Sequence, residues 1–149
     1  MTLTPVESPT EPDQQHESRT LDVLIKTFGV VIAVVAAVLS GLLEIFLAPL
    51  RVGGMPLGAS VVVATAGNYA IAWFAHTTVG RRWAVAPPWI VWTGLMLFAA
   101  GVRTDEGDYL ISGNNWVALV MILVGSLTFA VYAYRMILKP VPPAAIPKQ

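Results

Sequence analysis

The sequence predicts an all-α, polytopic membrane protein with four transmembrane helices in two hairpins. Of its 149 residues, 56% are hydrophobic and only 12% are charged, whereas about a quarter of the residues of a soluble domain are charged. Four segments are each apolar over about 20 residues, the length that crosses a hydrocarbon core at about 1.5 Å per residue. The first is apolar at every position from Val30 to Leu39, unlike the alternating strand of a barrel.

The transmembrane domain is expected over residues 21–139. Its four spans are expected at residues 27–48, 57–79, 83–102 and 116–138. Pro49 ends the first span, and the glycines and proline that follow form a turn short enough only for a tight helical hairpin.

The third span begins with two prolines and several tryptophans. Pro87 and Pro88 suit the first turn of a helix, where the missing amide proton is tolerated, so this helix is expected to be short. The three aromatic residues Trp83, Trp89 and Trp92 are expected to anchor one membrane interface.

Three polar segments flank or connect the spans. Residues 1–20 are rich in proline, glutamine and acidic side chains, so a disordered cytoplasmic tail is expected there. An acidic, glycine-containing loop is expected at residues 103–115, and a proline-rich cytoplasmic tail is expected at residues 140–149.

The distribution of basic residues predicts the orientation. Four spans put both termini on one side, which then carries seven Lys and Arg residues: Arg19, Lys26, Arg81, Arg82, Arg135, Lys139 and Lys148. The other side carries Arg51 and Arg103. The positive-inside rule therefore places both termini in the cytoplasm and the protein in the plasma membrane as a multi-pass protein.

Small residues at four-residue spacing mark the expected helix contacts. In the first span these are Gly29, Ala33, Ala37 and Gly41, and in the second span Ser60, Ala64, Asn68, Ala72 and His76. Small residues let helix backbones approach closely in lipid. The rows indicate packing within the four-helix unit or, as an alternative, the interface of a homo-oligomer.

Glu44 is the most informative polar residue because it lies inside an apolar span. A carboxylate costs a few kcal/mol there unless it is paired or protonated. We expect an ion pair with Arg103 or Arg51, which follow the outward ends of helices at similar depth. The alternative is a proton or cation site.

Two further polar residues lie in the second span. Asn68 is expected to hydrogen-bond across the bundle to Ser126 or Thr128 of the fourth helix. His76 lies one turn from the cytoplasmic end, where water or Tyr134 can meet it. The candidate intramembrane polar site therefore comprises Glu44, Arg51, Asn68, His76 and Arg103.

The composition argues against several classes of protein. The chain has no cysteine and a net charge of zero, which excludes thiol chemistry and gives no basic field for nucleic acid. It contains no phosphate-binding loop, nucleophile elbow or paired-histidine motif. We expect no enzyme activity, no catalytic residue, no metal and no cofactor.

Residues 21–138 resemble an uncharacterised actinobacterial family of small four-helix integral membrane proteins. The resemblance is carried by the stretch from Gly41 to Arg51, by Gly67 with Asn68, and by Gly107 with Asp108. It implies a cell-membrane location, and it transfers neither an activity nor an active site.

The expected function is that of a non-enzymatic accessory or assembly partner of a larger membrane complex. The expected partners are the lipid bilayer and either another membrane protein or further copies of the chain. The alternative is a small oligomeric transporter or channel that uses Glu44 as a proton or cation site.

Overall fold

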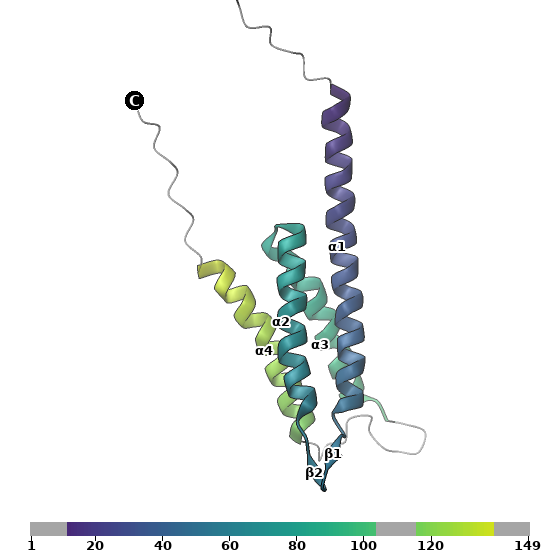
Figure 1. The fold of residues 1–149 in the computed structure, drawn as a ribbon, viewed down its shortest axis with the longest axis vertical. Coiled ribbons are helices and arrows are strands. Elements are labelled where there is room, and N and C mark those ends of the chain that lie inside the picture. The colour runs from purple at the N-terminus through teal and green to yellow at the C-terminus, as the bar shows by residue number, and fades with distance from the viewer. Residues whose placement is uncertain (1–11, 104–115, 139–149) are drawn as a thin grey trace, which may run out of the picture.

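The computed structural model describes residues 12–103 and 116–138, and this part of the chain is helical apart from one short β-hairpin (Figure 1). Its helices are α1 (Pro12–Leu47), α2 (Ala59–Val79), the 3-10 helix η1 (Arg82–Val85), α3 (Ala86–Gly101) and α4 (Trp116–Leu138). The all-α class is therefore confirmed. Residues 1–11 of the expected N-terminal tail, residues 104–115 of the expected acidic loop and the expected tail at 140–149 lie outside the described residues.

The N-terminal limit of the first helix differs from the expectation. Residues 12–20 belong to α1, so the prediction that all of residues 1–20 are disordered is wrong for this part. Proline is favourable at the start of a helix, and extending a helix that has already formed avoids the cost of nucleation. As a result α1 is 36 residues long, or about 54 Å at 1.5 Å per residue.

The other helix limits follow local signals. α4 has the expected bounds, and α3 begins at Ala86 with Pro87 and Pro88 in its first turn, as expected. α2 begins after Gly58 and ends before Gly80, and both glycines have a positive φ. At the second end, the Gly80 amide donates to the His76 carbonyl at 2.8 Å, a common way to end a helix.

A short β-hairpin with a two-residue turn connects α1 to α2. Strands β1 (Arg51–Val52) and β2 (Met55–Pro56) pair antiparallel, with Val52 opposite Met55. The turn residues Gly53 and Gly54 have φ of 60° and 84°. Glycine adopts this left-handed region at little cost, and two such residues suit a tight β-hairpin turn. The expected α1–α2 hairpin is confirmed.

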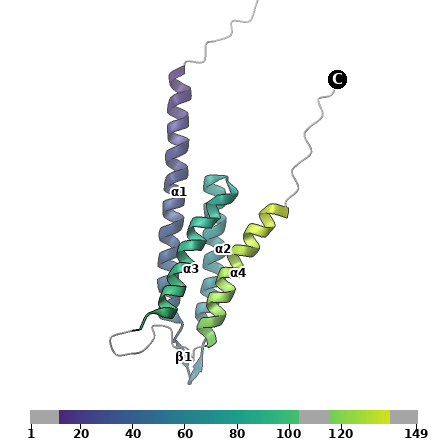
Figure 2. The same cartoon turned by 180° about the vertical axis from the view of Figure 1, so that it is seen from behind.

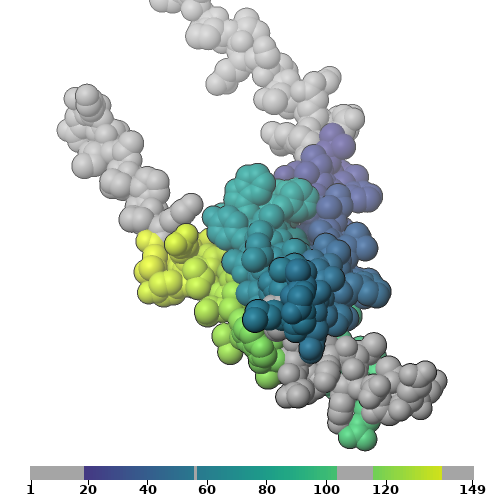
Figure 3. Space-filling view, turned by 60° about the horizontal axis from the view of Figure 1, so that its bottom comes forward, coloured from purple at the N-terminus to yellow at the C-terminus, as the bar shows by residue number. Residues whose placement is uncertain are grey.

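The second pair of helices does not pack as the first does. α3 packs mainly against α1, and α4 packs mainly against α2, whereas α3 and α4 touch each other over a smaller area (Figures 1 and 2). A space-filling view shows the C-terminal part of α4 standing apart from α1, with α2 between them (Figure 3). The central α1–α2 pair therefore organises the bundle, and α3 and α4 flank it.

The small-residue rows lie where close approach requires them. Gly29, Ala33, Ala37 and Gly41 are all buried on α1, and Ser60, Ala64, Asn68 and Ala72 are buried on α2. The expectation that both rows face the bundle is confirmed for these residues, whereas His76, the last member of the α2 row, is only half-buried. Small side chains bring the two backbones close together, which gains dispersion contacts where lipid offers no hydrophobic driving force.

Three helical segments are long and apolar enough to cross a membrane by length and composition. They are Arg19–Leu47, Arg82–Gly101 and Trp116–Leu138. Exposed leucine, isoleucine, valine and phenylalanine side chains cover the outer faces of these segments. An apolar exterior around a core that also contains polar groups is compatible with a membrane protein.

Candidate functional site

Glu44 lies on the buried face of α1, one helical turn after Gly41, and its exposed fraction is 0%. Both carboxylate oxygens accept a hydrogen bond. The Ser40 hydroxyl donates to Oε1 at 2.7 Å, and the Trp92 indole Nε1 donates to Oε2 at 3.1 Å. A buried carboxylate is costly unless it is hydrogen-bonded. These two donors stabilise it, and the bond from Trp92 connects α3 to α1.

The expected ion pair of Glu44 with Arg51 or Arg103 is not formed. The hydrogen bonds of the carboxylate go to Ser40 and Trp92, and both arginines have exposed side chains. Arg51 lies in β1, beyond the end of α1, and Arg103 follows the end of α3. Glu44 instead points between helices, so similar depth along the bundle does not bring the charges together.

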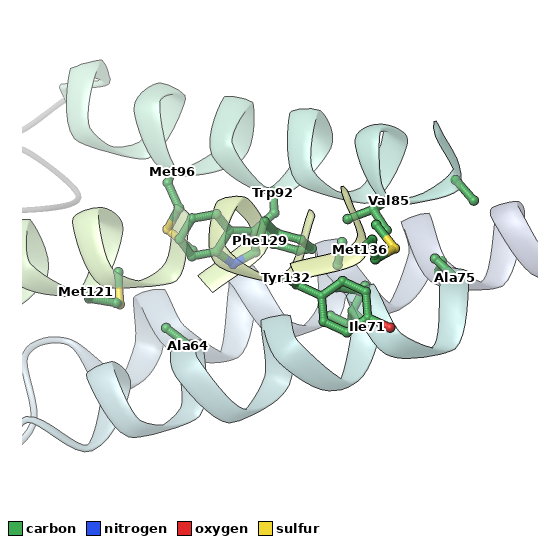
Figure 4. Close-up of a cluster of buried hydrophobic side chains, with 14 of the residues drawn as sticks. Ala64, Ile71, Ala75, Val85, Trp92, Met96, Met121, Phe129, Tyr132 and Met136 are labelled. Carbon is green, nitrogen blue, oxygen red and sulfur yellow. The ribbon is translucent and has the colours of Figure 1, made fainter. Parts of the chain in front are cut away.

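Trp92 is buried in the bundle, so its predicted place at the membrane interface is wrong. It was expected at the membrane interface, but its exposed fraction is 0%, whereas Trp83 and Trp89 are exposed at 54% and 39%. Trp92 shares one face of α3 with Met96, four residues later, and with Ala99, three residues after Met96. This helical spacing is the sequence signal for burial. In Figure 4 the Trp92 ring lies beside Phe129, and the ring centroids are 6.3 Å apart.

A glycine of α4 makes room for the Trp92 ring. A Cβ atom at Gly125 would lie 2.3 Å from Cη2 and 2.7 Å from Cζ2 of the ring, distances far below van der Waals contact. Gly41 of α1 makes room for other side chains of α3, since a Cβ atom there would lie 2.8 Å from Leu95 Cδ2 but 3.4 Å from Trp92 Cδ1. The indole therefore passes α4 at a glycine.

Asn68 supplies a second buried polar group in the same region of the bundle. Its side chain is fully buried, and neither amide atom has a hydrogen-bond partner in the described part of the chain. The expected partners are otherwise engaged: the Ser126 hydroxyl accepts from Trp89 Nε1 at 3.1 Å, and the Thr128 hydroxyl donates to the Val124 carbonyl at 2.8 Å. The predicted bond to α4 is therefore wrong.

The polar residues form one cluster at the meeting point of the four helices. A Cβ atom at Gly67 would lie 2.8 Å from the Ser40 hydroxyl, and one at Gly125 would lie 3.0 Å from Asn68 Nδ2. We call Ser40, Glu44, Asn68 and Trp92 the central polar cluster. It contains one carboxylate, one amide, one hydroxyl and one indole donor, and all four side chains come from α1, α2 or α3.

His76 lies outside this cluster, in the last turn of α2. It is half-buried and contacts Tyr132, with ring centroids 6.1 Å apart at 70°. Tyr132 in turn meets Tyr69 at 5.4 Å and 80°. Of the two expected partners, water and Tyr134, the tyrosine is wrong: His76 meets Tyr132, and Tyr134 points outward with 60% exposure.

The described residues offer no metal centre, since no group of three or more His, Asp or Glu side chains among them could hold an ion. The central polar cluster has one ionisable member, Glu44, held between two donors. The hydrogen bond from Trp92 to Glu44 suits orientation of α3 against α1.

A groove opens on the side of the bundle where α3 and α4 diverge. It has a volume of about 610 Å³ and is lined mainly by leucine, isoleucine and alanine side chains. The smallest side chains that line the groove are those of Ala100 on α3 and of Ser126 and Ala130 on α4.

No family model, curated protein or solved structure matches the chain.

Proposed function

We propose that this chain is a small integral membrane protein that acts through helix contacts, as a non-enzymatic accessory or assembly partner of a membrane complex. The single observation that supports this role best is the apolar groove between α3 and α4. Helices that follow each other in the chain usually pack together. Here they diverge and leave an apolar surface that includes small side chains, which suits close approach of another helix.

The proposal includes α2 as a fourth span. α2 has 21 residues, or about 31 Å of helix. Its polar residues Ser60 and Asn68 are buried against neighbouring helices, so they lower its average hydropathy without facing lipid. A helix enclosed by α1 and α4 needs less apolar surface than one exposed to lipid on most sides.

The proposed orientation places both termini in the cytoplasm. It rests on the positive-inside rule and on the count of Lys and Arg residues, which is seven on the side of the termini and two on the other side. A reporter fused after Gln149 tests it: the proposal expects activity of a cytoplasmic reporter and none of a reporter that works only outside the cell.

The cysteine-free sequence allows a direct test of the groove. Ala130→Cys places a thiol in the groove, and Val62→Cys places one on the outer face of α2, where the side chain is 69% exposed. In native membranes the groove thiol should form a cross-linked adduct with another membrane polypeptide, and the control thiol should not. Native mass measurement in mild detergent should show the same partner.

Two results would overturn the accessory role. One is an isolated monomer of 16.0 kDa in mild detergent, with no adduct at either position. The other is an equal yield of adducts from both positions, which would mean random collision. An adduct of twice the monomer mass from Ala130→Cys alone would identify a second copy of the chain as the occupant. The role would then be self-assembly and not assembly with a different protein.

The second candidate is an oligomeric transporter or channel that uses Glu44. It is favoured by the burial of Glu44 together with the buried amide of Asn68, which has no hydrogen-bond partner in the described residues. Proton-linked flux in liposomes that is present in the wild type and lost in Glu44→Gln would support it. Equal flux in both proteins, or none in either, would remove it.

A further inference from the structure

A second cavity lies at the end of the bundle opposite the β1–β2 hairpin. It has a volume of about 480 Å³ and lies between the N-terminal half of α1 and the segment that follows α2. Its lining includes three cations, Arg19, Lys26 and Arg81, against one carboxylate, Asp22. The cavity therefore carries an excess of positive charge.

The single carboxylate is already engaged. Lys26 Nζ donates to Asp22 Oδ2 at 2.5 Å, one helical turn away on α1. Neither Arg19 nor Arg81 forms an ion pair with another described residue. Two guanidinium groups, one from each wall, are thus left to bind an anion. Guanidinium binds phosphate through two parallel hydrogen bonds, which gives both strength and geometry.

The cavity lies at the level of lipid headgroups in the proposed membrane placement, on which this inference rests. A Cβ atom at Gly29 would lie 2.6 Å from Thr78 at the end of α2, so α2 ends at the level of Gly29. α1 continues to Pro12, roughly 25 Å further. The hydrocarbon boundary set by α2 therefore falls near Gly29, and the cavity lies just above it.

The rest of the lining fits a lipid better than a small soluble anion. Val23, Val30 and Val79 form an apolar wall, and the half-exposed Trp83 lies at the rim. Tryptophan is enriched at headgroup level because its ring is apolar and its N–H is polar. An apolar wall below a pair of arginines matches an acyl chain below a phosphate.

We infer that this cavity binds the phosphate headgroup of an anionic phospholipid, with Arg19 and Arg81 as the phosphate ligands. Basic pockets between helices on the cytoplasmic side of membrane proteins bind such headgroups. The site is independent of the groove between α3 and α4, so a lipid can be bound there whether or not a partner protein is present.

The test uses the full-length protein in nanodiscs of equal parts phosphatidylcholine and phosphatidylglycerol, with native mass spectrometry of the lipids it retains. The wild type should retain phosphatidylglycerol in preference to phosphatidylcholine. Arg19→Ala with Arg81→Ala should weaken that preference about 25-fold, at about fivefold for each basic residue. The matched control is Arg82→Ala with Arg135→Ala, which removes two arginines that do not line the cavity, and it should retain the preference.

Three results would overturn the site. The first is equal retention of the two lipids by the wild type, and the second is an equal loss in the cavity and control variants. The third is displacement of the lipid by inorganic phosphate, which would identify a soluble phosphate as the ligand. Circular dichroism of each variant checks that the helices are intact. Failure of the wild type to enter nanodiscs would instead contradict the membrane placement.

Discussion

Replacing Gly125 by alanine tests the packing of Trp92 against α4. The added Cβ atom would lie 2.3 Å from Cη2 of an indole ring that is fully buried and held by its bond to Glu44. Neither the ring nor the backbone of α4 can yield without losing other contacts. Overpacking of this kind costs about 1 to 3 kcal/mol.

Gly94 provides the matched control because it is also a helical glycine, and a Cβ atom there would meet nothing within 4 Å. Alanine is favoured over glycine in a helix by about 1 kcal/mol. Gly94→Ala should therefore be neutral or stabilising. Because the same helix-propensity gain applies to both glycines, the two alanine variants should differ by the overpacking cost, roughly 1 to 3 kcal/mol.

The assay is reversible unfolding of each variant in mixed micelles, followed by circular dichroism. A third variant, Gly125→Ala with Trp92→Phe, removes the ring atoms that the new methyl group would strike. Its loss of stability should be smaller than the sum of the two single losses, with a coupling of about 0.5 to 3 kcal/mol. Equal stability of Gly125→Ala and Gly94→Ala, or additive losses in the double variant, would refute the packing derived for Trp92.

Three further predictions concern the polar residues. Trp92→Phe removes a donor to a buried carboxylate and should lower the unfolding free energy by about 1.5 to 3 kcal/mol. This loss should exceed that of Trp89→Phe, whose hydrogen bond is exposed. Equal losses of the two variants in unfolding experiments would contradict this. The losses of unfolding free energy from Glu44→Gln and Arg103→Ala should be additive within about 0.5 kcal/mol, because the hydrogen bonds of Glu44 go to Ser40 and Trp92. A larger coupling in a double-mutant cycle would indicate that Glu44 and Arg103 form the ion pair after all. Asn68→Leu should change the unfolding free energy little or raise it, since an apolar side chain of similar shape replaces a buried amide without a partner; a loss above about 1 kcal/mol would mean that the amide is satisfied in the membrane.

The helix rows show how much of the fold could be predicted from local pattern. The spacing of Gly29, Ala33, Ala37 and Gly41 places them on one face of a helix whatever surrounds it, and that face is buried. The turn at Gly53 and Gly54 is equally local, since its conformation depends on the residues themselves. The resemblance to a known family and the accessory function both stay predictions.

The candidate site was harder to predict because its contacts join distant parts of the chain. Glu44 and Trp92 are 48 residues apart, and nothing near either residue specifies the other. Charge alone favoured Arg51 or Arg103 as the partner, yet the buried side of α1 faces α3, where an indole N–H lies within hydrogen-bond distance. Trp89 and Trp92 differ by three positions and have different surroundings for the same reason.

The sequence by itself determined that the chain forms long apolar helices, where most of them begin and end, and which faces of α1 and α2 carry small residues. These properties depend on residue type and helical period, which act over a few neighbouring positions. Only the tertiary structure decided that α3 packs on α1, that Trp92 bonds to Glu44 and that α4 diverges to leave a groove. Those outcomes depend on how whole surfaces fit together, because the same apolar helix can pack on several neighbours at similar cost in lipid.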